Sequence, residues 1–436
     1  MVVDTVVLVL LLIYVLIILI SILELTSLSV AALVGAVLVA WFGIQYGVFT
    51  YEDALTFIDF RLLGLLIGTM IVVEVAKRGG LFNVFALYAI KFSKGNPGRL
   101  FVAICVTAAL VSMFLSDPTA MLLVAAATVT ITKLLNYDPT PYFLSAAIMI
   151  NLGGTSTLIG SVSNMIIGID AGLSFTDFLS FLGVCEIILW VLTITALYFV
   201  FRSRLGEKKV LPEYNPKEGI KDKQIFYRSA FVLVILIVLF LTLDKIGVGP
   251  EAVALGCAVL ALVLCKVDPA EIFKEIDWET VFFIGGFMFI VAGLERTQFL
   301  TDISVQLFSF AGGSSLLATQ MTLWFSGLAS VFVSNIAVAL TFTPIINAQA
   351  AAQVAAQAAP ALNINAIWSG LILGTNLGGA TTPFSGAVMM MAIGTLKREK
   401  ISVKFSDFTK IGVITSLIQL GFSSFYLIVR FGLMGT

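Results

Sequence analysis

The chain has 436 residues, of which 59% are apolar and only 12% are charged, and its mean hydropathy is +1.07. A typical soluble domain carries about 25% charged residues, so this composition excludes soluble globular folds and disordered chains. The net charge of −1 provides no field that attracts nucleic acid, and we expect no nucleic-acid partner. The apolar residues form continuous blocks rather than alternating segments, which indicates an all-α polytopic membrane protein in a lipid bilayer and not a β-barrel.

The chain contains no histidine, which excludes histidine metal sites and histidine proton relays. All four cysteines lie in apolar stretches without CxxC spacing, and we interpret them as small buried hydrophobic residues. The alternative is a soft ligand for a thiophilic substrate. We expect neither an enzyme nor a resident cofactor, and the sequence has no Walker motif for hydrolysing ATP itself.

Long apolar runs in chain order predict ten spans. They lie near residues 5–23, 28–46, 62–76, 143–167, 183–201, 229–243, 250–265, 280–294, 364–395 and 411–433. Two further blocks, about 100–133 and 315–348, are interrupted by polar residues in the middle. Each block is long enough for a re-entrant hairpin or for two crossings. The first run has no basic residue before it, so we read a retained span rather than a signal peptide.

The basic residues predict the orientation. With the N-terminus outside, the inside carries 21 of the 25 basic residues, and the outside keeps only Arg61, Lys245, Arg296 and Arg430. This distribution fits the positive-inside rule for either interpretation of the two interrupted blocks. We therefore predict a multi-pass protein of the inner cell membrane with both termini outside. The polar segment 202–228 becomes a cytoplasmic linker, with docking of a cytoplasmic partner as the alternative. The low-complexity segment 348–361 is predicted to be a surface helix or loop.

The two halves of the sequence resemble each other. Ile58-Asp59 recurs as Ile276-Asp277, and Ser116 recurs as Ser334, both at one offset that equals half the length of the chain. The tract Asn151–Gly154 recurs as Asn376–Gly379 at a slightly larger offset. Five spans per half turn the second half upside down, which is the plan of inverted-repeat transporters. We expect a first repeat over 1–201, with a hairpin at about 100–133 and a broken helix at 143–167. The second repeat covers 229–436, with a hairpin at about 315–348 and a broken helix at 364–395.

Each interrupted block carries a helix-start signal at its tip. In the first block, Asp117 followed by Pro118 predicts that a half-helix begins there. In the second block, Ser334 or Asn335 supplies the N-cap. The N-terminus of a half-helix points free N–H groups and a positive dipole end into the protein interior.

Two spans contain polar, glycine-rich breaks, 151–164 and 375–386. Unwound backbone is tolerated at membrane depth only where it is buried or lines a watery cavity. Its carbonyls suit a cation, and the neighbouring amides and hydroxyls suit a small polar solute. Helix packing through small residues is the alternative. The predicted binding residues of the tips and breaks are Ser116, Asp117, Thr119, Asn151, Gly153, Gly154, Thr155, Thr157, Asn164, Ser334, Asn335, Asn376, Gly378, Gly379, Thr381, Thr382 and Ser385.

Among the acidic residues, Asp117 is predicted to lie deepest in a span and to couple an ion gradient to transport. A helix cap without a transport role is the alternative. Na⁺ is predicted to contact Asp117, Asn151, Asn335 and Asn376 if it is the coupling ion. Glu74 and Glu186 lie near predicted span ends, and we expect both to reach the interface. Asp59 and Asp277 are predicted to be N-caps that face water.

The pattern N-x-G-G-x-x-T-x-I-G at Asn151–Gly160 and the acidic tip at Asp117 resemble the ion transporter superfamily over nearly the whole chain. They are most similar to its ArsB-type arsenite pump and P-protein branch, which is related to NhaD-type antiporters and citrate and dicarboxylate transporters. P-proteins usually carry Asp-Pro-Pro where this chain has Ser161-Val162-Ser163, whereas Val162–Leu179 looks closer to arsenite pumps. The resemblance implies inverted repeats, each with a re-entrant hairpin and a broken helix, and a substrate between the tips.

The resemblance and the polar tracts together predict a secondary transporter that works by alternating access. The leading substrate is arsenous acid, exported in exchange for protons, with Asp117 carrying the coupling proton. The alternatives are Na⁺/H⁺ antiport and Na⁺-coupled symport of an organic anion such as citrate or a dicarboxylate. A negative charge at Asp117 repels a dicarboxylate unless a cation or proton neutralises it. A cytoplasmic ATPase subunit and a homodimer remain candidate partners.

Overall fold

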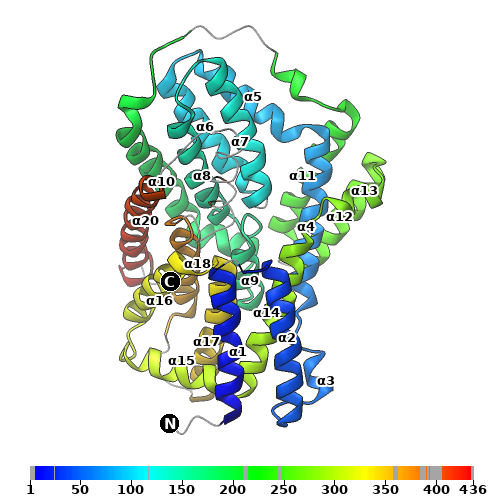
Figure 1. Cartoon of the computed structure of the whole chain (residues 1–436), viewed down its shortest axis with the longest axis vertical. Coiled ribbons are helices and arrows are strands. Elements are labelled where there is room, and N and C mark those ends of the chain that lie inside the picture. Colours follow the sequence, from blue (N-terminus) through cyan, green and yellow to red (C-terminus); the bar gives the residue numbers. More distant parts are fainter. Residues whose placement is uncertain are drawn as a thin grey trace.

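The computed structural model describes residues 5–23, 25–115, 117–209, 215–243, 247–356, 362–382, 389, 392 and 405–433 (Figure 1). Within these ranges the regular elements are all helical. Seven helices of the described part are long and apolar enough to cross a membrane, and several shorter apolar helices accompany them. The prediction of a multi-pass helical membrane protein is therefore confirmed.

The first half of the chain forms ten helices within the described residues. They are α1 (Thr5–Ile22), α2 (Leu28–Gln45), α3 (Tyr51–Ala54), α4 (Phe60–Gly79), α5 (Leu81–Ser93), α6 (Pro97–Ser112), α7 (Asp117–Leu134), α8 (Pro139–Thr155), α9 (Val162–Asp170) and α10 (Phe175–Phe201). Helix α7 begins at Asp117, where the sequence predicts a helix start. Asp59 caps α4 by accepting a hydrogen bond from the N–H of Arg61, so its predicted N-cap role is confirmed.

The second half follows a linker that contains the short 3₁₀ turns η1 (Arg202–Arg204) and η2 (Pro216–Gly219). Its elements are α11 (Lys223–Thr242), α12 (Pro250–Cys265), α13 (Pro269–Lys274), α14 (Trp278–Arg296), α15 (Phe299–Ser309), α16 (Ser315–Phe332), α17 (Asn335–Ala356), α18 (Ile364–Gly378), α20 (Phe405–Leu427) and the π-helix η4 (Ile428–Leu433). Asp277 caps α14 through the N–H of Thr280, which confirms its predicted N-cap role too.

The helix starts recur between the halves. One constant offset, equal to half the chain length, relates the first residues of α4, α5, α6 and α7 to those of α14, α15, α16 and α17. The starts of α8 and α18 differ by the same larger offset that separates Asn151 from Asn376. The short helices α5 and α15 were not predicted as separate elements. Each begins directly after a residue with positive φ, and these two residues, Gly80 and Gln298, are again related by the first offset.

Helices of one half pack closely against helices of the other. Helix α4 packs on α12, and α14 packs on α2. A Cβ atom at Gly68 would lie 2.7 Å from the backbone carbon of Ala254, and one at Gly286 would lie 2.8 Å from that of Ala32. Only glycine permits this approach of two backbones. The same exchange of partners in both directions makes α4–α12 and α2–α14 two tightly packed pairs, which together we call the frame.

The helices of the two interrupted blocks occupy different ends of the molecule. Helices α6 and α7 lie in the upper half of Figure 1, whereas α16 and α17 lie in the lower half. Helix α6 packs on α8 and α16 packs on α18. Gly153 of α8 faces the backbone of Ala109, and Gly378 of α18 faces the backbone of Gly327. The segment 348–361 was predicted to be a surface helix or loop, and its described part continues α17 to Ala356 as a helix with exposed side chains such as Val354.

Helix α10 is longer than the predicted span. It begins at Phe175, where Ser174 and Asp177 form a capping box, and it runs for 27 residues. Glu186 therefore lies roughly 16 Å from its first residue, in the middle of a helix about 40 Å long. The Glu186 side chain is only 2% exposed. The expectation that Glu186 reaches the interface is wrong, because the sequence pattern placed the start of the span eight residues too late.

Candidate functional site

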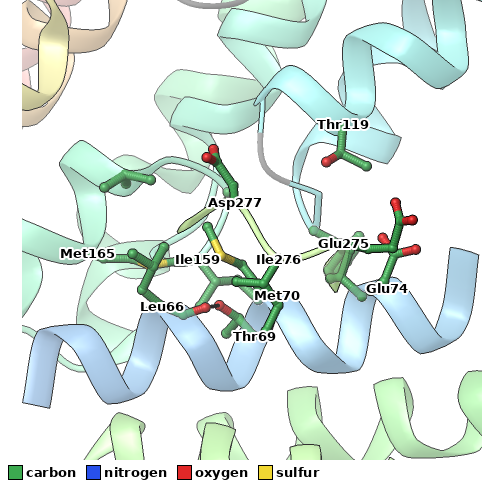
Figure 2. A pocket seen from close by; sticks show the side chains of 14 residues that line it. Leu66, Thr69, Met70, Glu74, Thr119, Ile159, Met165, Glu275, Ile276 and Asp277 are labelled. Carbon is green, nitrogen blue, oxygen red and sulfur yellow. Dashed lines mark hydrogen bonds between the residues drawn. The ribbon is translucent and has the colours of Figure 1, made fainter. Parts of the chain in front are cut away.

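A small cavity of about 40 Å³ lies where the first tip meets the first broken helix. This volume holds two or three water molecules. Figure 2 shows side chains of α4 along one wall and Thr119 of α7 on the opposite side. The lining residues are Leu66, Thr69, Met70, Val73, Glu74, Phe114, Thr119, Ile159, Gly160, Val162, Met165, Glu275, Ile276 and Asp277. The cavity thus joins α4, the first tip, the break before α9 and the start of α14.

The ionisable side chains that line this cavity are all acidic: Glu74, Glu275 and Asp277. Glu74 is buried, and its carboxylate forms an ion pair with Nζ of Lys77 at 2.9 Å. It is therefore a paired charge and not an isolated one. Asp277 caps α14 and is half-buried. A cavity with acidic walls favours a cation or an uncharged polar solute over an anion.

The two broken helices touch each other through their asparagines. The side-chain amide of Asn151 donates to the backbone carbonyl of Asn376 at 2.8 Å. The amide of Asn376 donates to Oδ1 of Asn164 at 2.7 Å and to the carbonyl of Ile372 at 2.8 Å, and its Oδ1 accepts from the hydroxyl of Ser163 at 2.9 Å. Asn376 is 1% exposed, and Asn151 and Asn164 are also buried. We call Asn151, Ser163, Asn164 and Asn376 the asparagine bridge.

Asn164 also holds the unwound backbone between α8 and α9. Its Nδ2 donates to the carbonyls of Gly154, Thr155 and Thr157, at 3.0, 3.3 and 2.8 Å. The hydroxyl of Thr157 reaches across to the carbonyl of Met113 beside the first tip, at 2.7 Å. Carbonyls that the sequence offers to a cation are therefore bonded to a side-chain amide in this structure. A bound ion would have to displace that amide.

Other predicted residues serve the breaks from within. Thr155 donates to the carbonyl of Asn151 at 3.1 Å. In the second break, Thr381 donates to the hydroxyl of Ser416 on α20 and Thr382 donates to the carbonyl of Val331 on α16, both at 2.9 Å. Gly379 lies at the end of α18, and a Cβ there would lie 3.7 Å from Oδ1 of Asn151. The break residues thus link α8, α16, α18 and α20 around the asparagine bridge.

The two tips are described unequally. Asn335 is buried at the start of α17, where its Oδ1 accepts from the N–H of Ile336, and Ser334 directly precedes it. Helix α17, which begins at this tip, packs against α9 of the first broken helix. Ser116, Ser385 and the side chain of Asp117 lie outside the described residues. The predicted coupling role of Asp117 and the predicted Na⁺ ligands stay predictions.

Several polar residues that the candidate set omitted belong to the same region. Ser163 joins the asparagine bridge. Ser156, at the end of α8, bonds to Oε2 of Glu186 at 3.2 Å and accepts from the indole N–H of Trp190 at 3.0 Å. The sequence signal that would have placed Glu186 correctly is the one that marks the start of α10. A capping box at Ser174 and Asp177 placed the helix start early enough to put Glu186 at mid-membrane.

Residues 14–369 match the family described as citrate transporter. The chain belongs to this family. A 46 kDa membrane protein of Mycobacterium leprae is 28% identical over 413 residues, which cover 93% of this chain and 94% of that protein. An uncharacterized transporter of Synechocystis is 24% identical, with 91% of each chain covered. The P protein of Sus scrofa is 23% identical over 88% of this chain and 55% of its own length.

The fold resembles a solved transporter structure. The YdaH transporter of Alcanivorax borkumensis, whose crystal structure revealed an unusual topology, superposes with a TM-score of 0.61 over 86% of each chain. The sequence identity between the two chains is 13%, so the likeness is one of fold. The family and its named relatives agree with a membrane transporter, which is the class that the sequence predicts.

Proposed function

We propose that this protein is a secondary active transporter that works by alternating access, with two halves that are inverted repeats. The asparagine bridge carries the proposal. Asn151 and Asn376 occupy corresponding positions in the two halves, and their side chains and backbones meet in the buried interior. The repeated helix starts and the exchanged partners of Gly68 and Gly286 support the symmetry.

The bridge describes a closed state of the site. Its bonds are buried, and each contributes about 1 kcal/mol net, whereas leaving one partner unsatisfied costs about 1–3 kcal/mol. A solute with several hydroxyl or carboxylate oxygens replaces those partners when it enters, so the site opens without stranding buried groups. Water replaces these hydrogen-bond partners less well when few water molecules can enter the site. The bridge therefore favours opening only when a solute is present.

The packing separates a frame from a moving part. Helices α2, α4, α12 and α14 meet backbone to backbone at glycines, which resists sliding. The hairpins α6–α7 and α16–α17 pack instead on the broken helices α8 and α18. We infer that hairpins and broken helices move together against the frame. By the predicted orientation, the acidic cavity at Glu74, Glu275 and Asp277 opens toward the cytoplasm.

Protons are the coupling ion that we favour, with Asp117 as their carrier, and Na⁺ is the alternative. Each elementary charge moved through 100 mV supplies about 2.3 kcal/mol, enough for a roughly fifty-fold gradient. Na⁺ needs several oxygen ligands, and the described carbonyls of Gly154, Thr155 and Thr157 already accept bonds from Asn164. A proton needs only one carboxylate.

Two substrates follow from two observations. The amides, hydroxyls and acidic walls favour arsenous acid, which is uncharged at neutral pH and carries three hydroxyls. The family description favours an organic anion of the citrate class. Such an anion has to enter with a neutralising cation or proton, because the charged groups that line the cavity are acidic.

The test uses purified protein in lipid vesicles with an imposed pH gradient or Na⁺ gradient. Arsenite and citrate are offered separately, with empty vesicles as the background. We expect gradient-driven accumulation of one solute, dependent on the pH gradient, and its loss in Asn376→Ala. Equilibration that ignores both gradients would indicate a passive channel and refute the proposal. A dependence on Na⁺ alone would replace the proton as coupling ion.

A further inference from the structure

A buried carboxyl group lies outside the asparagine bridge and the acidic cavity. Glu186 on α10 is 2% exposed, and its Oε1 has no hydrogen-bond partner among the described residues. Its Oε2 lies 3.2 Å from the hydroxyl oxygen of Ser156. In the described part of the chain, no cationic side chain forms an ion pair with Glu186. Among the described residues, an ionised carboxylate here has neither a counter-charge nor a full set of donors.

The titratable groups described on helices packed against α10 provide no opposite charge that pairs with Glu186. Cys185 precedes it on α10 and is buried, and the phenol of Tyr426 on α20 donates to the carbonyl of Phe181 on α10. The other titratable residues described on α10 and on the elements packed against it are Arg99, Cys105, Tyr142, Asp177, Tyr198, Arg202, Arg204, Lys223, Tyr227, Arg228, Lys410 and Arg430. No hydrogen bond or ion pair in the described part of the chain joins any of these residues to Glu186.

The geometry around Ser156 distinguishes the two protonation states. Ser156 accepts from the indole N–H of Trp190 at 3.0 Å and lies 3.3 Å from the carbonyl of Leu152 and 3.2 Å from Glu186. It has one hydroxyl hydrogen to give. When Glu186 is protonated, its O–H donates to Ser156, and Ser156 donates to Leu152 in the last turn of α8. When Glu186 is ionised, the hydroxyl hydrogen must turn to the carboxylate, and Leu152 loses that bond.

We propose that Glu186, Ser156 and Trp190 form a proton-binding site in which the bound proton closes the last turn of α8. Ser156 is the C-cap of α8 and begins the unwound segment that leads to α9. Loss of the proton redirects the Ser156 hydroxyl to the carboxylate and releases the end of α8 beside the break. The site thus links proton occupancy to the conformation of the first broken helix. This link to transport rests on the proposed function, whereas proton binding does not.

A polar pair continues along the same interface. Two turns further along α10, Thr193 accepts from Nε2 of Gln419 on α20 at 3.0 Å. Both side chains are buried, and Oε1 of Gln419 has no partner among the described residues. An unsatisfied acceptor at this depth gives a water molecule a place to bind. The α10–α20 interface thus holds a second buried polar group that is not fully satisfied among the described residues.

Infrared difference spectroscopy of the reconstituted protein tests the proton site directly. A buried protonated carboxyl group gives a carbonyl-stretch band that an ionised one lacks. We expect a pH-dependent band that disappears in Glu186→Gln and shifts in Ser156→Ala, because the protonated acid would donate to the Ser156 hydroxyl oxygen, which lies 3.2 Å from Oε2. Glu74→Gln is the matched control: this carboxylate is also buried in a helix but is paired with Lys77, so the band should stay. An unchanged spectrum in Glu186→Gln would overturn the proposal.

A flux measurement tests the link to the broken helix. In vesicles, pH-driven flux of the transported solute should fall at least tenfold in Glu186→Gln, whereas Glu218→Gln on the exposed linker should match the wild type. Unchanged pH-driven flux in Glu186→Gln would refute the link. If the wild type shows no gradient-driven flux of either solute, the proposed function fails, and the infrared band still decides whether Glu186 binds a proton.

Discussion

Replacing Asn376 by alanine tests whether the asparagine bridge holds the two broken helices together. The change removes the donor to Oδ1 of Asn164 and the acceptor for Ser163. Ser163 keeps its contact with Ser161 at 2.9 Å, but Oδ1 of Asn164 is left buried without this donor. One stranded acceptor and the small void together cost about 2–4 kcal/mol. At about 2.1 cal/mol/K per residue, this lowers the melting temperature by on the order of 2–5 °C.

The assay is thermal unfolding in detergent alongside flux in vesicles. Thr375→Val is the matched control, because Thr375 is equally buried on the same helix but bonds only to carbonyls of its own preceding turn. Asn376→Asp keeps the size and the acceptor for Ser163, yet it turns the donor toward Asn164 into a second acceptor. We expect this variant to be less stable than Asn376→Ala at neutral pH and to recover in acid, where the protonated carboxyl group donates to Asn164. If both variants melt and transport like Thr375→Val, the bridge does not hold the site.

Three further results follow from the packing, the first tip and the topology. Gly68→Ala should destabilise the protein strongly, because its Cβ meets the backbone of Ala254. The control Gly256→Ala has open space around it, so its free energy of unfolding should stay within about 1 kcal/mol of the wild type. Equal melting temperatures of the two variants would contradict the frame. Asp117→Asn should lose pH-driven flux in vesicles, and full pH-driven flux would remove Asp117 from the coupling role. A cysteine added after Thr436 should react with an impermeant reagent in intact cells and Asn215→Cys should not; the reverse would invert the orientation.

The pattern of apolar runs predicted most spanning helices because lipid imposes a simple requirement on them. A helix that crosses hydrocarbon needs about 20 apolar residues, and such a run is enough to predict it. The predicted starts at residues 28 and 250 coincide with those of α2 and α12. Helices α5 and α15 were not predicted, because they have 13 and 11 residues, which is too short for a membrane span. Only the tertiary packing shows that they are separate from the helices before them.

The candidate site was predicted as a set of residues but not as a set of contacts. Asn151, Asn164 and Asn376 were selected because amides in a glycine-rich break suit a small polar solute, and the structure shows that they bond to one another. The sequence could not reveal this pairing, because so long a separation along the chain leaves the relative depth of two helices open. Glu186 was misjudged for a different reason. An apolar run marks the part of a helix that faces lipid or the core, whereas the capping box at Ser174 marks where the helix begins.

The glycine contact of α4 with α12 also bears on how the protein is made. Gly68 lies in the first half of the chain and its partner Ala254 in the second, so the two are synthesised far apart in time. At roughly 5–20 residues per second, the ribosome needs on the order of 10–40 s to supply that partner. During this interval the bare backbone stripe of α4 faces lipid or the insertion machinery, and α2 waits in the same way for α14. The contacts of α4 with α12 and of α2 with α14 therefore form only after the N-terminal half has been synthesised. Completion of the frame depends on the later part of translation rather than on the order in which helices enter the membrane.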